Sequence, residues 1–191
     1  HTVSVTGGDG THGALAASIA GANVSTGDGA GSIDWTYTVA DSDVDYLAAD
    51  QTVVQTYTVT VTDDEGTKAS QAVTITINGT NDVPTIDVAT ASSSVTELAD
   101  GVAGELTSDL TTTGSIAFAD VDLTDTHTVS VTGGDGTHGA LTASIADVST
   151  GDGAGSIDWT YTVSDGVVDY LGVGDSVVQT YTVTVTDDEG E

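Results

Sequence analysis

The chain has 191 residues, with 30 acidic side chains against a single Lys or Arg, so its formal net charge is −29 at pH 7. Because phosphate groups are bound by basic side chains, this balance excludes nucleic acid and anionic membrane surfaces as partners. The absence of cysteine excludes disulfides, thiol chemistry and cysteine-based zinc sites. Of the acids, 25 are Asp, and they gather in Gly-rich turns, which favours calcium over a merely solvated acidic surface.

A long internal repeat organises the chain. Residues 1–66 recur almost letter for letter as 127–190, and most of the differences lie within 40–52 and 164–176. The spacing is 126 residues before the GAN insert at 21–23 and 124 after it, which is domain-sized and too long for a solenoid. We therefore predict two domains: residues 1–83, the C-terminal part of one repeat, and 84–191, the next repeat without its final strand.

The predicted strands follow from alternation of apolar and polar residues. In IDWTYTV, four side chains fall on one face and the polar residues on the other. The apolar face of this strand and of the other predicted strands comprises, in chain order, Ile33, Trp35, Tyr37 and Val39; Tyr57, Val59 and Val61; Val73, Ile75 and Ile77; Ile86 and Val88; Ile116 and Phe118; and Val129 and Val131. Thr and Val dominate these segments, and both favour pleated structure.

The segments between the strands have the composition of turns. GGDG, STGDGAGS, TDDEG and NGTND combine Gly with Asx side chains, which bond to their own backbone. The one candidate for a helical turn, ELADG at 97–101, is interpreted as loop. The pattern predicts an all-β fold of tandem antiparallel β-sandwiches with Greek-key connections, truncated at both ends. With no apolar run of about 18 residues and no basic leader, we expect neither a membrane span nor a signal peptide in this segment.

Three segments in the order of a domain resemble a known family. GSIAFADVDLTDTHTVSV at 114–131, DYLGVGDSVVQTYTVTVTDDEG at 169–190 and QAVTITINGTNDVPTI at 71–86 are similar to the VCBS repeats of giant bacterial surface proteins. The resemblance covers nearly the whole chain. It implies Ig-like or cadherin-like sandwiches in long arrays, within adhesins exported by type I secretion systems to the bacterial cell surface.

The resemblance also implies calcium ligands at the junction of the repeats. NGTNDVP resembles the cadherin linker DxNDNxP, although Asn78 replaces its first acid and the order at 81–82 is reversed. DVD at 120–122 resembles the DxD that the following cadherin domain contributes. The junction ligands we expect are Asn81, Asp82, Glu97, Asp120 and Asp122, with Asp125 further out. A second candidate site lies at the TDDEG turn, formed by Asp63, Asp64 and Glu65 and repeated as Asp187, Asp188 and Glu189.

Other residue types point to no catalytic chemistry. Trp35 and Trp159 could stack on sugars, but both lie on the apolar face of a predicted strand, which favours core packing. His12 and His138 follow GGDG in a turn without a paired nucleophile, and we interpret them as solvated. Pairs of acids are too common in this chain to indicate acid–base catalysis. We therefore predict that the protein is not an enzyme.

The expected function is mechanical: a calcium-stiffened extender segment of an extracellular adhesin or fibre, which projects a distal binding module and supports adhesion and biofilm formation. Its partners would be neighbouring repeats of the same chain. Because unpaired strand edges are templates for pairing, head-to-tail self-association is also expected. Two alternatives remain, a self-assembling filament subunit that exchanges strands between chains and a carbohydrate-binding β-sandwich module.

Overall fold

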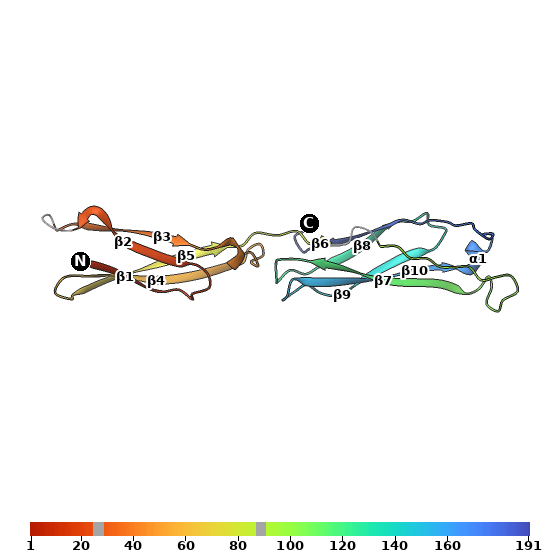
Figure 1. The fold of residues 1–191 in the computed structure, drawn as a ribbon, viewed down its shortest axis with the longest axis horizontal. Coiled ribbons are helices and arrows are strands. Elements are labelled where there is room, and N and C mark those ends of the chain that lie inside the picture. Colours follow the sequence, from red (N-terminus) through yellow and green to blue (C-terminus); the bar gives the residue numbers. More distant parts are fainter. Residues whose placement is uncertain (25–28, 87–90) are drawn as a thin grey trace. The chain divides into compact units, whose positions relative to one another are not determined.

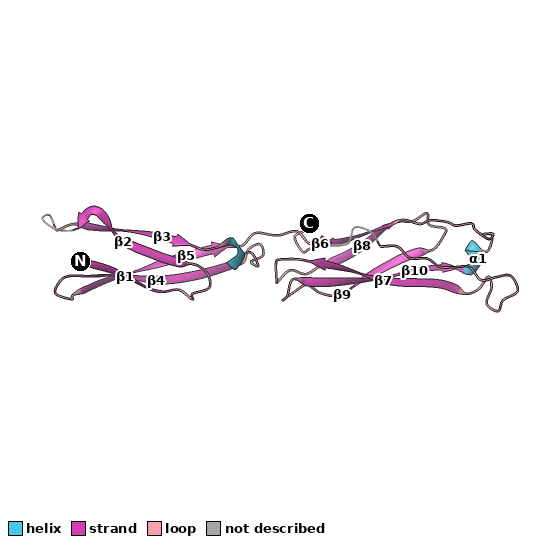
Figure 2. Ribbon diagram, viewed as in Figure 1, coloured by secondary structure: helices cyan, strands magenta, loops and turns pink. Residues whose placement is uncertain are grey.

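The computed structural model describes residues 1–24, 29–86 and 91–191, and it is almost entirely β-structure (Figures 1 and 2). The chain divides into two compact units, His1–Asn81 and Asp82–Glu191, so the boundary falls two residues before the one predicted from the repeat. The described part of the chain contains no helix of the length and hydrophobicity needed to cross a membrane.

Unit 1, residues 1–81, contains two antiparallel sheets. The first has the order β1-β4-β5 and the second consists of β2 and β3. Leu15 from the second sheet packs with Tyr57 and Val59 from the first, and this contact forms the core of the unit in the manner of a sandwich. The strands are β1 (Thr2–Gly7), β2 (Ala14–Val24), β3 (Gly31–Thr38), β4 (Thr52–Thr62) and β5 (Lys68–Asn78).

Unit 2, residues 82–191, repeats this arrangement with a larger second sheet. That sheet has the order β6-β7-β10-β9 and faces a sheet of β11 and β8. Phe118, Ile157 and Val185, from both sheets, form its buried core. The strands are β6 (Thr85–Ile86), β7 (Asp109–Ala119), β8 (Thr128–Gly133), β9 (Ala140–Asp147), β10 (Ala154–Ser164) and β11 (Tyr181–Thr186).

The structure confirms the all-β antiparallel class and the absence of a helix at ELADG. It also contains three kinds of element that alternation did not predict: the Ala-rich strands β2 and β9, a 3-10 turn η1 (Asp41–Asp43) and a four-residue helix α1 (Asp165–Val168). Alanine has low β-propensity, so β2 and β9 give a weak strand signal although they pair with β3 and β10 over most of their length, with one register shift in each pairing. Val88, predicted to face the core, lies outside the described residues.

The prediction that both tryptophans are buried is right for Trp159 and wrong for Trp35. Trp159 is 8 % exposed, whereas Trp35, at the same place in an identical strand segment, is 48 % exposed. The difference comes from the neighbouring strand, because β7 pairs with β10 in unit 2 and no described strand pairs with β3 on that side. Alternation identifies the face of a strand, but burial also requires a neighbour that covers the face.

Candidate metal centre

Five acidic side chains converge at one end of unit 2. Asp120, Asp122 and Asp125 lie in the loop that begins directly after β7, and Asp187 and Glu189 lie in the turn directly after β11. Each of two groups, Asp120–Asp122–Asp125 and Asp125–Asp187–Glu189, has carboxylate oxygens within 4.8 Å of one another. Asp125 belongs to both groups and so connects the loop after β7 with the turn after β11. We refer to these five residues as the carboxylate cluster.

The loop that carries the first three acids is held in place by hydrogen bonds. The backbone N–H of Asp120 donates to the Gly153 carbonyl at 3.0 Å, and the Thr150 hydroxyl donates to the Asp125 carbonyl at 2.7 Å. The Asp122 N–H donates to Asp120 Oδ1 at 3.0 Å, in an Asx turn. These contacts fix the backbone from which the carboxylates project.

Burial makes this cluster unusual. Asp120, Asp122, Asp125 and Asp187 are 3 %, 0 %, 2 % and 4 % exposed. His127 Nε2 lies 2.8 Å from Asp120 Oδ2. Buried carboxylates are ordinarily paired with a cation or protonated, because an unpaired buried charge is costly. The cluster therefore needs a positive partner when it is ionised.

Asp125 shows that need most directly. Its Oδ2 atom is buried and has no hydrogen-bond partner among the described residues. Burial, and after it the charges of Asp122 and Glu189, raise the pKa of Asp125 to about 6. The pKa of Glu189 is raised as well, first by desolvation and then by Asp188 and Asp187. In both shifts the second contribution, after burial, is repulsion among carboxylates, and a bound cation would offset that repulsion.

The chemistry of the donors fits a hard cation. All five side chains offer carboxylate oxygens, which calcium, magnesium and manganese prefer, whereas zinc and copper sites usually include nitrogen or sulfur. Two of the acids also have outer hydrogen bonds that orient them. Asp187 Oδ1 accepts the N–H groups of Gly190 and Glu191 at 2.7 and 2.8 Å, and Asp120 contacts His127. Such orientation is typical of metal-ligating carboxylates.

The remaining predicted junction residues are distributed differently. Asp82, the first residue of unit 2, donates its backbone N–H to Asp122 Oδ2 at 2.6 Å, so the chain enters the unit beside the cluster. Asn81 belongs to unit 1. The structure does not bring Glu97 to the cluster: the next residue, Leu98, donates its N–H to Asp165 Oδ1, at the other end of β10.

The predicted turn site is assembled in unit 2 alone. Asp187 and Glu189 belong to the carboxylate cluster, and Asp188 Oδ1 accepts the Thr126 N–H at 2.8 Å beside it. In unit 1, Asp63 Oδ1 caps its own turn by accepting the Thr67 N–H, and Asp64 pairs with the amino terminus at 3.1 Å. Neither these two acids nor the exposed Glu65 belongs to a group of three potential ligands in the described part of unit 1.

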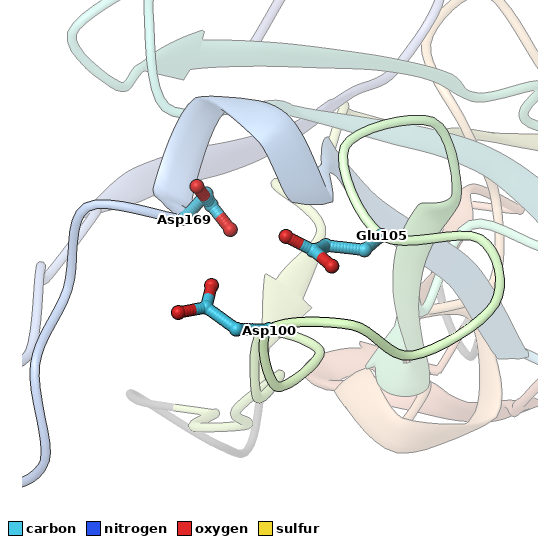
Figure 3. Close-up of side chains that lie close together, drawn as sticks. All are labelled: Asp100, Glu105 and Asp169. Atoms are coloured by element: carbon cyan, nitrogen blue, oxygen red, sulfur yellow. The ribbon is translucent and has the colours of Figure 1, made fainter.

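A second acidic group, which alternation and turn composition did not indicate, lies at the opposite end of β10. Figure 3 shows Asp100, Glu105 and Asp169 pointing toward one another, the first two from one loop and the third from just after α1. The fully buried Asp165 anchors this loop by accepting the N–H groups of Leu98 and Leu106, at 2.6 and 2.9 Å. Asp100 is exposed and Glu105 and Asp169 are half-buried, and Asp169 Oδ1 is a buried oxygen with no hydrogen-bond partner among the described residues.

The histidines after GGDG are bound rather than simply solvated. His12 Nδ1 contacts Asp9 Oδ2 at 2.5 Å and His12 Nε2 contacts the Tyr46 hydroxyl at 2.8 Å. Unit 2 repeats this network with Asp135, His138 and Tyr170. Hydrogen bonds from the backbone and side chain of the histidine hold the pKa of Asp9, and that of Asp135, well below the usual range. The network ties a hairpin turn to a neighbouring loop, and the hydroxyls of Thr11 and Thr137 each lie 3.1 Å from Nδ1 of the histidine that follows them.

The raised pKa of Asp125 predicts the pH dependence of unit 2 without cations. The pKa is about 6 in the folded state and 3.8 for an ordinary Asp, so between these values the folded state binds more protons and stability falls as pH rises. In a chelator, lowering the pH from 7 to 5 should raise the free energy of unfolding of unit 2 by about 1 kcal/mol. Hydrogen exchange, read separately for each unit, measures this change. Unit 1 is the control, because its stability changes only through the lower net charge of the whole chain. An equal increase in the free energy of unfolding of both units would contradict the prediction.

Comparison with known proteins adds no family to this description, since no protein-family model matches the chain and none of the curated proteins is significantly similar.

Proposed function

We propose that the carboxylate cluster binds calcium, and that the chain is an extender segment of a bacterial surface adhesin whose repeats calcium stiffens. The observation that carries the proposal is the buried Asp125 Oδ2, which has no hydrogen-bond partner in the described part of the chain and is surrounded by other carboxylates. One divalent ion among these oxygens supplies the missing positive charge.

Calcium suits the cluster better than magnesium. Calcium accepts six to eight oxygen ligands in irregular geometry, whereas magnesium demands near-octahedral geometry and gives up its water reluctantly. The cluster offers five carboxylates from two separate loops, which is a set for a larger ion with flexible coordination. We propose Asp120, Asp122, Asp125, Asp187 and Glu189 as the ligands.

Asp82 connects ion binding at the cluster with the stiffness of the backbone that enters unit 2. Its N–H donates to Asp122 Oδ2, and Val83 and Pro84 follow immediately. An ion held by Asp122 fixes the carboxylate on which the entering backbone rests, and Pro84 restricts the backbone further. Without an ion, repulsion among the carboxylates loosens this entry point. Calcium would thus control how rigidly the chain enters unit 2.

The rest of the proposal is supported by the repeat and the fold class. Near-identical units of antiparallel β-structure suit a spacer, in which the number of units matters more than the detail of each. We propose that the units are Ig-like or cadherin-like Greek-key sandwiches in an extracellular array on the cell surface. In this role the chain performs no catalysis.

Small-angle scattering with calcium and with chelator tests this function. Calcium should narrow the distribution of particle dimensions, because it fixes the backbone at Asp82 through Asp122. Asp122→Asn should respond much less to calcium, while its matched control Asp63→Asn, in a turn outside the cluster, should respond like the original chain. Identical scattering in calcium and chelator would refute the stiffening role.

A self-assembling filament subunit, in which strands are exchanged between copies, is the alternative function that we propose. The exposed Trp35 also meets one requirement of a carbohydrate-binding module, an accessible aromatic ring. Trp159, in the same sequence context, is buried beneath a neighbouring strand. That contrast shows that the burial of this tryptophan depends on a neighbouring strand.

A further inference from the structure

A serine and a histidine lie directly behind the carboxylate cluster. Ser149 Oγ lies 3.1 Å from His127 Nδ1, and His127 Nε2 lies 2.8 Å from Asp120 Oδ2. Ser149 is 0 % exposed, and so are the side chains of His127 and Asp120. The three side chains therefore form a buried chain of hydrogen bonds that ends on a proposed calcium ligand.

The same three residue types occur in hydrolytic triads, but the arrangement here differs from a triad. In a triad the serine contacts Nε2 of the histidine and the aspartate contacts Nδ1, whereas here the two nitrogens are exchanged. The complete burial of Ser149 also keeps its hydroxyl away from any substrate. These contacts therefore point to a role inside the protein.

The charge of Asp120 sets the direction of both hydrogen bonds. An ionised carboxylate can only accept, so the proton between the two side chains lies on His127 Nε2. In a neutral imidazole Nδ1 is then the acceptor, and the Ser149 hydroxyl donates to it. The N–H of Asp122 donates to the other oxygen of Asp120, Oδ1, at 3.0 Å. Both oxygens of this carboxylate are thus oriented by the protein.

The turn that carries Ser149 also supports the backbone of the ligand loop. It is the STGDG segment at 149–153, whose composition indicated only a turn. Besides the Thr150 and Gly153 contacts described above, Gly151 donates its N–H to the Leu123 carbonyl at 2.8 Å. One short turn therefore contacts the ligand loop at three backbone positions and, through His127, at one carboxylate.

We propose that His127 and Ser149 are positioning residues of the metal centre. Ser149 holds the imidazole, and the imidazole holds Asp120 in the orientation in which it binds the cation. Packing fixes the imidazole as well, because its ring centroid lies 5.1 Å from that of Phe118. The inference rests on the proposed calcium site, and it extends that site from the ligands to the residues that orient them.

Calcium titration of the full chain beside variants of His127 tests the role of the imidazole. His127→Phe keeps a ring of similar size beside Phe118 but removes the donor, so it should weaken calcium binding by about tenfold or more. His127→Gln places an amide N–H near the position of Nε2 and should bind within about threefold of the original chain. His138→Phe is the matched control, because His138 contacts Asp135 and Tyr170 in the hairpin network, and it should bind normally.

A double-mutant cycle tests whether Ser149 acts through His127. Ser149→Ala should weaken calcium binding by about threefold, the scale of one modest hydrogen bond, and should have no further effect in the His127→Phe chain. A merely structural role of the serine would give additive losses. Nuclear magnetic resonance of the ring nitrogens adds an independent measurement, since the original chain should carry the His127 proton on Nε2. A protonated Nδ1 would contradict the assignment.

The outcomes separate this inference from the proposed function. Absence of calcium binding by the original chain would refute the calcium site and the positioning role together. If the original chain binds calcium and a folded His127→Phe chain binds it equally well, the positioning role alone is overturned. It is also overturned if His127→Gln loses as much affinity as His127→Phe. Should His127→Phe fail to fold, Ser149→Ala decides, and an unchanged calcium affinity would overturn the proposal.

Discussion

Replacing Trp159 with alanine should lower the free energy of unfolding of unit 2 by about 3–5 kcal/mol, the usual cost of deleting a buried tryptophan side chain. Trp159 is 8 % exposed, and its ring lies directly on Gly114 of β7. Glycine has no side chain that could move into the space, so collapse around the cavity is limited. A large part of the unit's stability rests on this one ring, given that domains are typically stable by only about 5–15 kcal/mol.

The repeat supplies a matched control. Trp35→Ala, in the same sequence context but 48 % exposed, should cost less than about 1 kcal/mol. The two units need not unfold together, so a single melting transition does not apportion the effect. Hydrogen exchange followed by mass spectrometry reads the two units separately. Equal losses from the two substitutions would mean that β7 does not bury Trp159 as described.

Calcium should stabilise unit 2 and leave unit 1 almost unchanged. An ion that binds only the folded state adds about 2.7 kcal/mol when its concentration is a hundred times the dissociation constant. Removal of the repulsion that raises the pKa of Asp125 is part of that gain. Magnesium at the same concentration should stabilise less, since it keeps its water and prefers octahedral sites. Denaturant titrations with calcium, magnesium and chelator measure the difference, and equal effects of the two ions would contradict a calcium site.

Most of the strands follow from local sequence, because a half-buried strand must alternate apolar and polar residues. The segment IDWTYTV is a strand in both units, and QTYTVTV lies within β4. The strands β2 and β9 were missed because alanine neither favours strands nor marks a face strongly. Tertiary pairing with β3 and β10 stabilises them instead. Local pattern also cannot say whether a neighbouring strand exists, which is why Trp35 was misassigned to the core.

The sequence indicated which types of residue form the candidate site, but only in part which individual residues come together there. The family resemblance implied Asp120 and Asp122, and the TDDEG turn indicated Asp187, but their approach depends on how two distant loops meet at the end of a sandwich. Glu97 illustrates the limit, since its neighbour Leu98 is bound to Asp165 at the far end of β10. The acidic group in Figure 3 depends on the loop that Asp165 anchors, a long-range contact with no local signature.

The most direct measurement of the calcium proposal is isothermal titration of the full chain beside two aligned variants, Asp187→Asn and Asp63→Asn. Both residues are the first acid of a TDDEG turn and accept backbone N–H groups, which an Asn side chain still accepts. Only Asp187 belongs to the carboxylate cluster. The account predicts that Asp187→Asn weakens calcium binding by at least about tenfold, which is the loss expected when a ligand, or a residue that orients a ligand, is replaced. Asp63→Asn should leave calcium binding unchanged. Equal binding by all three chains, or no calcium binding by the original chain, would contradict it.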